Sequence, residues 1–509
     1  MNAPGTMRAR WAGTLSVRGG DAKRKTCLRE PMERSSGVLL HPTSLCGPWG
    51  GGDIGPEARA FSVWLGRGRQ SWWQMLPLGP VDGGGSPYNS PSAFAGSAGL
   101  ISVDDLLADG LLGHEEVVDL RRDAPKGDVD FRFVEERRVP LVRRAAMRLA
   151  SDDAGGVAEF VAEQPWLPEW SAFAASKHEN GGAPWWEWDD RTPDPTLVAT
   201  ECAVQVLFAR QWSRLREAAG AAGVRLIGDL PIFVAGDSAD VTGQRSLFLL
   251  NEHGQPEVVA GCPPDAFTPA GQKWGMPLYD WEGNAATGFA WWRLRLTALL
   301  ERVDLVRIDH FRGFEAAWHV PVDAPDASTG RWVPGPGAQL FEALQESCGD
   351  TLPLIAEDLG IITPAVEALR DGFDLPGMRI LQFAFGGEPN HPYLPHSYPS
   401  RSVVYTGTHD NQTTLGWWLS IGEEERSRVL RYVGGGSGDP AWDLIRLAWD
   451  SPAELAVAPM QDLLALDDQS RLNTPGRAEG NWSWRLDTRP DDLVAGRLAE
   501  VTMRSGRAQ

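Results

Sequence analysis

The sequence has few cysteines, fewer basic than acidic residues, and no long apolar run. Its five cysteines are widely spaced and form no C-x-x-C pair, so neither a disulfide framework nor a zinc knuckle is indicated. Lysine and arginine number 48 against 68 aspartates and glutamates, which gives a net charge of −20 and a pI of about 4.9. Such a surface repels nucleic acid phosphates and anionic membranes, and no apolar run is long enough to span a bilayer. We therefore expect a cytoplasmic protein with neither nucleic acid nor membrane as its partner.

Tryptophan is present in excess, with 23 among 509 residues. Most tryptophans in any protein lie in the core, but the indole face also stacks well on a sugar ring. With 42% hydrophobic residues the chain can bury a large core, either as one large barrel with insertions or as two to three domains.

Residues 1–31 differ in composition from the rest of the chain. They carry seven basic and two acidic residues and show no periodic apolar pattern. We expect a disordered leader here, followed by a single catalytic unit over residues 32–509. An organelle transit peptide is the alternative, although the segment has no convincing amphipathic face and Met32 offers another start. A secretory signal is not indicated, because there is no apolar h-region.

Short apolar runs alternate with helical stretches along the chain. Eight of these runs predict strands, within residues 37–44, 72–78, 224–234, 304–309, 353–360, 378–385, 402–411 and 455–461. The pattern predicts a (β/α)₈ TIM barrel, in which catalytic groups come from the carboxyl ends of several strands. Two segments are too long for one crossover and predict insertions, at about residues 101–196, which read as mostly helical, and 236–281, which is rich in glycine and proline.

The strand that ends at Asp309 carries the densest group of charges. The apolar residues before Asp309 are β-formers, and side chains alternate along a strand, so Arg307 and Asp309 face the same way. An arginine beside a carboxylate favours the ionised form, which a nucleophile needs. A structural ion pair is the simpler alternative, and this strand alone does not decide between the two.

Other strand ends carry acids that could act with Asp309. Glu357 has no basic neighbour in the sequence, which suits a proton donor whose pKa must lie near the working pH. A retaining glycosidase needs such a nucleophile and acid/base pair roughly 5–5.5 Å apart. Asp410, beside His409, could hold sugar hydroxyls as an oxocarbenium ion develops, whereas Asp229 could accept hydroxyls or cap the next helix. A metal site built from these acids and nearby histidines is the rival, but no paired-histidine spacing supports it.

Seven motifs occur in a fixed order along residues 36–486. They are SGVLLHPTSL (36–45), SPY with SAFAG (86–88 and 92–96), GDLPIFVA (228–235), RIDHFRG (307–313), AEDLG (356–360), GTHDN (407–411) and NTPG (473–476). With them the chain resembles the 4-α-glucanotransferases, also called amylomaltases or disproportionating enzymes, of glycoside hydrolase family 77. The resemblance implies a TIM barrel with inserted subdomains and no C-terminal β-sandwich, and a reaction that needs neither cofactor nor metal.

The resemblance also implies roles for individual residues. Asp309 would be the nucleophile, Glu357 the general acid/base and Asp410 the transition-state stabiliser. Five residues would contact the glucan, three at the reacting sugar and two through aromatic rings: Arg307, Asp229 and His409, then Tyr88 and Trp274.

The implied reaction cuts an α-1,4 bond in a malto-oligosaccharide or α-1,4-glucan, holds the fragment on Asp309, and passes it to the 4-hydroxyl of glucose, maltose or a longer acceptor. An α-amylase-type hydrolase would share the three acids but release its product to water. A non-catalytic glucan-binding protein would not need all three acids.

The sequence departs from the family pattern at three positions. Gln412 stands where aspartate is usual, Met276 where asparagine is common, and Cys46 where proline is usual. We expect these departures to affect rate and acceptor preference and not activity itself.

Overall fold

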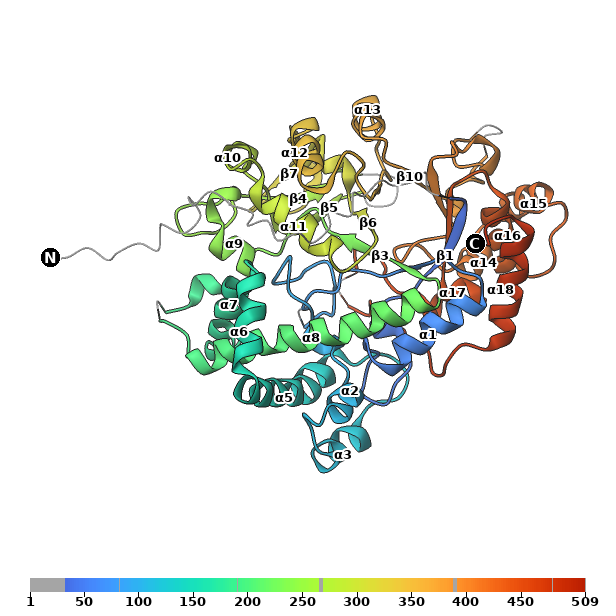
Figure 1. The fold of residues 1–509 in the computed structure, drawn as a ribbon. Helices are drawn as coiled ribbons and strands as arrows, with labels where there is room; N and C mark the ends of the chain where they lie inside the picture. Colours follow the sequence, from blue (N-terminus) through green and yellow to red (C-terminus); the bar gives the residue numbers. More distant parts are fainter. Residues whose placement is uncertain are drawn as a thin grey trace.

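The computed structural model describes residues 33–508 except 82, 190, 265–268, 388–390 and 478 (Figure 1). The expected leader, residues 1–31, and the alternative start at Met32 lie outside the described residues. Within the described part of the chain, no helix is long and apolar enough to cross a membrane.

Eight parallel strands close into a barrel. They are β1 (Ser35–Leu39), β2 (Trp72–Gln74), β3 (Arg225–Leu230), β6 (Leu305–Ile308), β9 (Leu354–Ala356), β10 (Gly377–Ile380), β11 (Ser402–Tyr405) and β12 (Leu455–Pro459). Their order around the barrel is β1-β12-β11-β10-β9-β6-β3-β2. The predicted (β/α)₈ barrel and its eight strands are therefore confirmed.

Several strands are shorter than the apolar runs that predict them. After Ile380 the chain turns into a short 3-10 helix over Leu381–Phe383, and after Pro459 it enters α17 (Met460–Leu463). An apolar run in the sequence indicates that its residues are buried, and burial continues through these turns. The run is therefore longer than the strand itself.

The barrel interior is filled by alternate residues of its strands. They form one buried cluster: Leu39, Trp72, Ile227, Leu305, Ile355, Met378, Ile380, Val403, Tyr405, Leu455 and Val457. Because strand side chains alternate, the residues between these point outward to the surrounding helices. A packed interior leaves the open carboxyl end of the barrel as the place where a substrate can meet strand residues.

Helices surround the barrel on its outer face. They include α1 (Pro56–Arg67), α8 (Pro195–Ala221), α11 (Ala290–Leu300), α12 (Ala338–Cys348), α13 (Pro364–Gly372), α14 (Thr414–Ser420), α15 (Glu423–Tyr432), α16 (Pro440–Asp450) and α18 (Asp492–Arg504). Helix α8 begins at Pro195, at the end of the first predicted insertion. Pro195 fits the first helical turn, and the Asp194 side chain caps it by accepting the Thr196 N–H at 2.7 Å.

The two predicted insertions adopt different structures. Residues 101–196 contain α2 (Val103–Ala108), α3 (His114–Asp123), α4 (Phe131–Phe133), α5 (Val139–Asp152), α6 (Ala154–Glu163) and α7 (Leu167–Glu179). In Figure 1, α5, α6 and α7 lie beside α8. Residues 236–281 contain α9 (Ala239–Gly243), β4 (Val258–Cys262), β5 (Gln272–Pro277) and the start of α10 (Trp281–Ala286).

Strands β4 and β5 belong to a second sheet, which the apolar pattern of the sequence does not predict. With β7 (Ala316–Pro321) and β8 (Arg331–Pro334) they form an antiparallel sheet in the order β5-β4-β7-β8. The segment that follows Asp309 thus pairs with the second insertion. This pairing places β5, which carries Trp274, close to the end of β6.

Candidate active site

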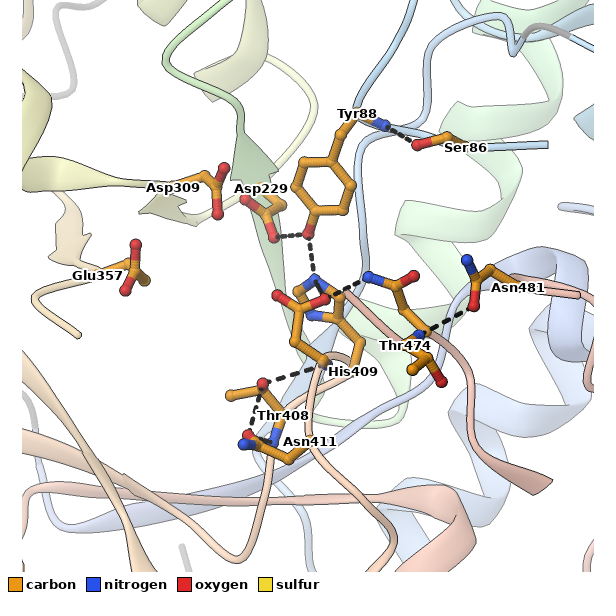
Figure 2. A network of polar contacts seen from close by, with 12 residues as sticks. Ser86, Tyr88, Asp229, Asp309, Glu357, Thr408, His409, Asn411, Thr474 and Asn481 are labelled. Atoms are coloured by element: carbon orange, nitrogen blue, oxygen red, sulfur yellow. Dashed lines mark hydrogen bonds and ion pairs between the residues drawn. The ribbon is translucent and has the colours of Figure 1, made fainter. Parts of the chain in front are cut away.

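The strand register brings the predicted acids to one edge of the barrel. Asp229 in β3 pairs with Arg307 in β6, and Ile308 in β6 pairs with Ala356 in β9. Asp309 and Glu357 each follow directly after these last paired residues. Figure 2 shows Asp229, Asp309 and Glu357 on one side of the site and Thr474 and Asn481 on the other, with Tyr88 and His409 between them in this view.

Arg307 joins two of the carboxylates. One guanidinium nitrogen, Nη1, donates to both oxygens of Asp229 at 2.9 and 2.8 Å, and Nη2 lies 3.0 Å from Oδ1 of Asp309. Burial lowers the pKa of Arg307, but the two carboxylates outweigh it and hold that pKa well above its usual range. The Asp229 side chain is fully buried, whereas that of Asp309 is 27% exposed. Asp309 is therefore the more accessible of the two carboxylates.

Glu357 lies in a different environment. Its Oε2 accepts the backbone N–H of His310 at 2.7 Å and its Oε1 accepts that of Leu359 at 2.9 Å. His310 has a left-handed backbone with φ 49°, which turns its N–H toward Glu357. Burial raises the pKa of Glu357 to about 8, with Arg307 opposing the rise and Asp309 adding to it. A carboxyl that keeps its proton at neutral pH can act as a general acid.

Tyr88 and His409 complete the polar network. The Tyr88 hydroxyl donates to Oδ2 of Asp229 at 2.8 Å and lies 2.9 Å from Nε2 of His409. Burial lowers the pKa of His409, so the imidazole is neutral at neutral pH. Because the hydroxyl gives its hydrogen to Asp229, we assign the imidazole hydrogen to Nε2, which donates back to the hydroxyl oxygen. The two rings stack with centroids 5.3 Å apart, so His409 covers one face of the Tyr88 ring.

Asp410 is the most exposed of the three proposed catalytic acids, with 41% of its side chain accessible. Its Oδ1 accepts a hydrogen bond from Asn473 at 2.6 Å and lies 3.4 Å from Nε2 of His409. Asn411 stabilises the preceding turn, because its side-chain oxygen accepts the N–H and the hydroxyl of Thr408, both at 2.8 Å (Figure 2). The carboxylate is thus fixed at one oxygen and accessible at the other.

Trp274 lies beside this network. Its ring meets His310 edge to face with centroids 4.9 Å apart, and its Nε1 donates to Gln272 at 3.1 Å. The side chain is partly exposed. The eight predicted site residues therefore all lie at the mouth of the barrel. Trp274 lies at the edge of the group, where its ring contacts His310, the residue after Asp309.

Sequence comparison now assigns the family. A profile of the family described as 4-alpha-glucanotransferase matches residues 40–490. The chain belongs to this family. The 4-alpha-glucanotransferase of Thermus thermophilus is 44% identical over 481 residues, which cover 89% of this chain and 95% of the relative. That of a Synechocystis strain is 42% identical over 499 residues, which cover 93% and 98%.

A solved relative agrees with this assignment. The amylomaltase from Streptococcus agalactiae, in complex with acarbose, superposes with a TM-score of 0.89 at 34% identity, covering 94% of this chain and all of its own. The family and its members support transfer between α-1,4-glucans as the reaction, and not the α-amylase-type hydrolase alternative.

A large cavity of this glucanotransferase fold lies beside the acids and not over them. It measures about 1090 Å³ and lies between the barrel loops and the helical insertion, with His41, Pro87, Asn89, Trp170 and Trp482 in its wall. A smaller cavity of about 60 Å³ is lined by Tyr88 and Asp229. We place the chemistry at the acids, because their mutual contacts and contrasting environments are what bond cleavage requires. Among the described residues, no group of three or more His, Cys, Asp or Glu could hold a metal ion.

Two residues at the site were not identified from the sequence. Asn473 lies in the NTPG motif, which marks the segment but assigns it no role. Trp482 adopts a left-handed backbone with φ 67° and places its ring 5.8 Å from Tyr88 and 6.0 Å from His409. No local pattern distinguishes Trp482 from the other tryptophans, because its partners are distant in sequence.

Proposed function

We propose that Asp309 is the nucleophile and Glu357 the acid/base of a retaining transfer between α-1,4-glucans. The observation that carries this proposal is the contrast between two carboxyl groups at the ends of adjacent strands. Asp309 has a guanidinium 3.0 Å away, whereas burial raises the pKa of Glu357 to about 8. A carboxylate paired with a guanidinium beside a carboxyl group that keeps its proton is what double displacement requires.

The first step breaks the bond to the leaving glucan. Glu357 donates its proton to the glycosidic oxygen while a carboxylate oxygen of Asp309 attacks the anomeric carbon from the opposite face. The carbon–oxygen bond breaks, the leaving glucan departs with a new hydroxyl, and an ester joins the remaining glucan to Asp309. Asp410 stabilises the oxocarbenium character that develops between these states, with its negative charge close to the ring.

The second step transfers the glucan. Ionised Glu357 accepts the proton of the acceptor 4-hydroxyl, whose oxygen attacks the anomeric carbon as the ester bond breaks. The products are a new α-1,4 bond and free Asp309, and Glu357 is protonated again. Because two inversions occur, the configuration at the anomeric carbon is retained.

The reacting sugar is held by the buried network around Asp229. Arg307, Asp229, His409 and Tyr88 are fixed to one another before substrate arrives, so they can bind sugar hydroxyls with little reorganisation. Trp274, with its partly exposed ring, is the residue we assign to stacking on the acceptor.

We propose glucose and maltose as acceptors in addition to longer glucans. The barrel-mouth position of Trp274 supports this, because one ring suffices to hold one glucose. Labelled glucose supplied with maltotriose should then appear at the reducing end of longer products, and labelled glucose left unincorporated would contradict the assignment.

A cytoplasmic location is also proposed, supported by five widely spaced cysteines without a disulfide pattern. Some plant relatives are described as chloroplastic or amyloplastic, so cell fractionation is the measurement that decides.

The roles of the two acids are tested with a donor that needs no acid. α-Glucosyl fluoride has a good leaving group, so Glu357→Gln should still form the glucosyl ester from it while losing at least about a hundredfold of its turnover on maltotriose. Asp309→Asn should lose nearly all turnover on both donors, by about a thousandfold or more, because no nucleophile remains. Substantial activity of Asp309→Asn on the fluoride would show that another residue is the nucleophile.

A further inference from the structure

We propose that Asn473 is a positioning residue for glucan transfer, which acts by holding the Asp410 carboxylate in one orientation. Asn473 opens the NTPG motif, to which the reaction described above gives no role. The inference rests on the proposed function of Asp410 as the stabiliser of the transition state. Asn473 itself need not touch the sugar.

Asn473 contacts both residues of the His409–Asp410 pair. Its side-chain Nδ2 donates to Oδ1 of Asp410 at 2.6 Å, and its backbone N–H donates to the carbonyl oxygen of His409 at 3.1 Å. A hydrogen bond to an ionised acceptor is among the stronger ones in proteins. The bond engages Oδ1, so Oδ2 can face the sugar.

Arg471 ties the two segments together independently of the Asn473 side chain. Its Nη2 donates to the backbone oxygen of Asp410 at 2.6 Å, and its Nε donates to the backbone oxygen of Asn473 at 2.7 Å. These contacts, with the backbone bond to His409, remain when the asparagine side chain is shortened. We therefore expect Asn473→Ala to fold with its loop in place and Asp410 free to rotate.

An amide suits this position better than a cation would. Asp410 lies on a loop with 41% of its side chain exposed, so nothing but a specific bond limits its rotation. A lysine or arginine would hold the carboxylate but cancel the charge that stabilises an oxocarbenium ion. A neutral donor fixes the orientation and leaves the charge in place.

Asn481 provides a matched control within the same loop. Its side-chain oxygen accepts the N–H of Thr474 at 2.9 Å (Figure 2). Its Nδ2 donates to the carbonyl oxygen of Arg477 at 2.9 Å. It therefore stabilises the loop through the residue next to Asn473 without bonding to Asp410. Loosening of the loop alone would appear equally in Asn481→Ala and Asn473→Ala.

The first experiment measures kcat and KM on maltotriose for both variants. Asn473→Ala should lower kcat by about 10- to 100-fold, with KM changed less than about threefold, because orientation of the stabilising charge matters in the transition state. Asn481→Ala should stay within about threefold of the wild type in both constants. An equal fall in kcat for the two variants, or a fall for neither, would overturn the proposal.

The second experiment asks whether Asn473 acts through Asp410. Rates with α-glucosyl fluoride at high enzyme concentration are compared in wild-type and Asp410→Asn backgrounds. Asn473→Ala should cost less than about threefold once Asp410 has lost its charge, and a full loss in that background would refute action through Asp410. Near wild-type activity of Asp410→Asn by itself would instead show that the proposed function of Asp410 is wrong, whatever Asn473 does.

Discussion

Two acidic neighbours illustrate how a residue's surroundings set its chemistry. Glu357 and Asp358 are adjacent in sequence and point to opposite faces, as alternation predicts. Asp358 accepts the N–H of Met378 at 2.7 Å and pairs with Arg370, so its oxygens are committed to holding strands and helices together. Glu357 faces the site with backbone donors and a raised pKa. One is structural and the other is available for proton transfer.

The pH dependence of catalysis follows from the protonation of Glu357. In the proposed first step the protonated form of Glu357 is the active one, and burial raises its pKa to about 8. From neutral pH to about pH 8 kcat/KM should therefore be steady, and above that it should fall about tenfold per pH unit, since the proton of Glu357 is lost as pH rises. A pH–rate profile on maltotriose measures this. With α-glucosyl fluoride and Glu357→Gln the alkaline fall should disappear, and its persistence there would assign it to another group.

Gln412, where the family pattern has aspartate, is matched to its surroundings in this chain. Its Nε2 donates to Oδ2 of Asp468 at 2.6 Å, and Oδ1 of Asp468 accepts the N–H of Thr413 at 3.0 Å. An aspartate at position 412 would lose this bond and bring a second negative charge toward Asp468. The departure thus preserves the turn that follows Asp410.

Gln412→Asp should therefore be harmful here although it restores the family residue. We expect it to lower the free energy of unfolding by about 1–3 kcal/mol, through the lost hydrogen bond and like-charge repulsion, and to reduce kcat because the turn after Asp410 loosens. Adding Asp468→Asn should recover most of both losses. Thermal unfolding and maltotriose assays of the single and double variants measure this, and a neutral Gln412→Asp would show that the pair does not position the turn.

Among the helices and strands, the sequence predicts well those elements that depend on a short stretch of neighbouring residues. The barrel strands were predictable because each is a short apolar run that leads into polar or acidic residues. The antiparallel sheet could not be predicted, because β4 pairs with β7 across the whole of α10, α11 and β6. Such pairing depends on tertiary contacts that no window of sequence contains.

The segment after α18 shows a stabilising element that local pattern also missed. Arg507 is fully buried and donates to five backbone carbonyls, those of Ser35, Trp449, Ser451, Ala453 and Glu454. Burial lowers its pKa to about 9. The end of the chain thereby ties β1 to the segment between α16 and β12 at the amino end of the barrel.

Removing this arginine should destabilise the barrel without affecting the chemistry. Arg507→Ala removes five hydrogen bonds made by one buried guanidinium, while Arg34 still donates to the carbonyls of Trp449 and Ser451. We expect the change to lower the free energy of unfolding by about 3–5 kcal/mol. Arg504→Ala, which removes an exposed ion pair to Asp450 at 3.5 Å, should cost less than about 1 kcal/mol. Chemical denaturation compares the two, and equal losses would show that the buried carbonyl contacts are not what stabilises this end of the barrel.

Across the whole molecule, the site is assembled from residues far apart in the chain. Tyr88 and His409 are separated by 321 positions, yet the hydroxyl and the imidazole lie 2.9 Å apart. The acids could be chosen from the sequence because each ends a strand, and closure of the barrel brings strand ends together. Motif resemblance supplied their roles. The Tyr88–His409 contact and the bond from Asn473 to Asp410 required the structure, since neither follows from strand position.

In the proposed mechanism, transfer and hydrolysis share the ester on Asp309, and they diverge only when an acceptor sugar or water attacks it. An acceptor held by Trp274 over the ester would exclude water and favour transfer. The family and its relatives support transfer, so products should conserve the number of glycosidic bonds.

Incubation with maltotriose tests this most directly, with products resolved by size and new reducing ends counted against bonds cleaved. A transferase should yield glucose and a ladder of longer glucans, with far fewer new reducing ends than bonds cleaved. New reducing ends equal to the bonds cleaved, with no product longer than maltotriose, would show that water is the acceptor and that glucan transfer is not the reaction of this chain.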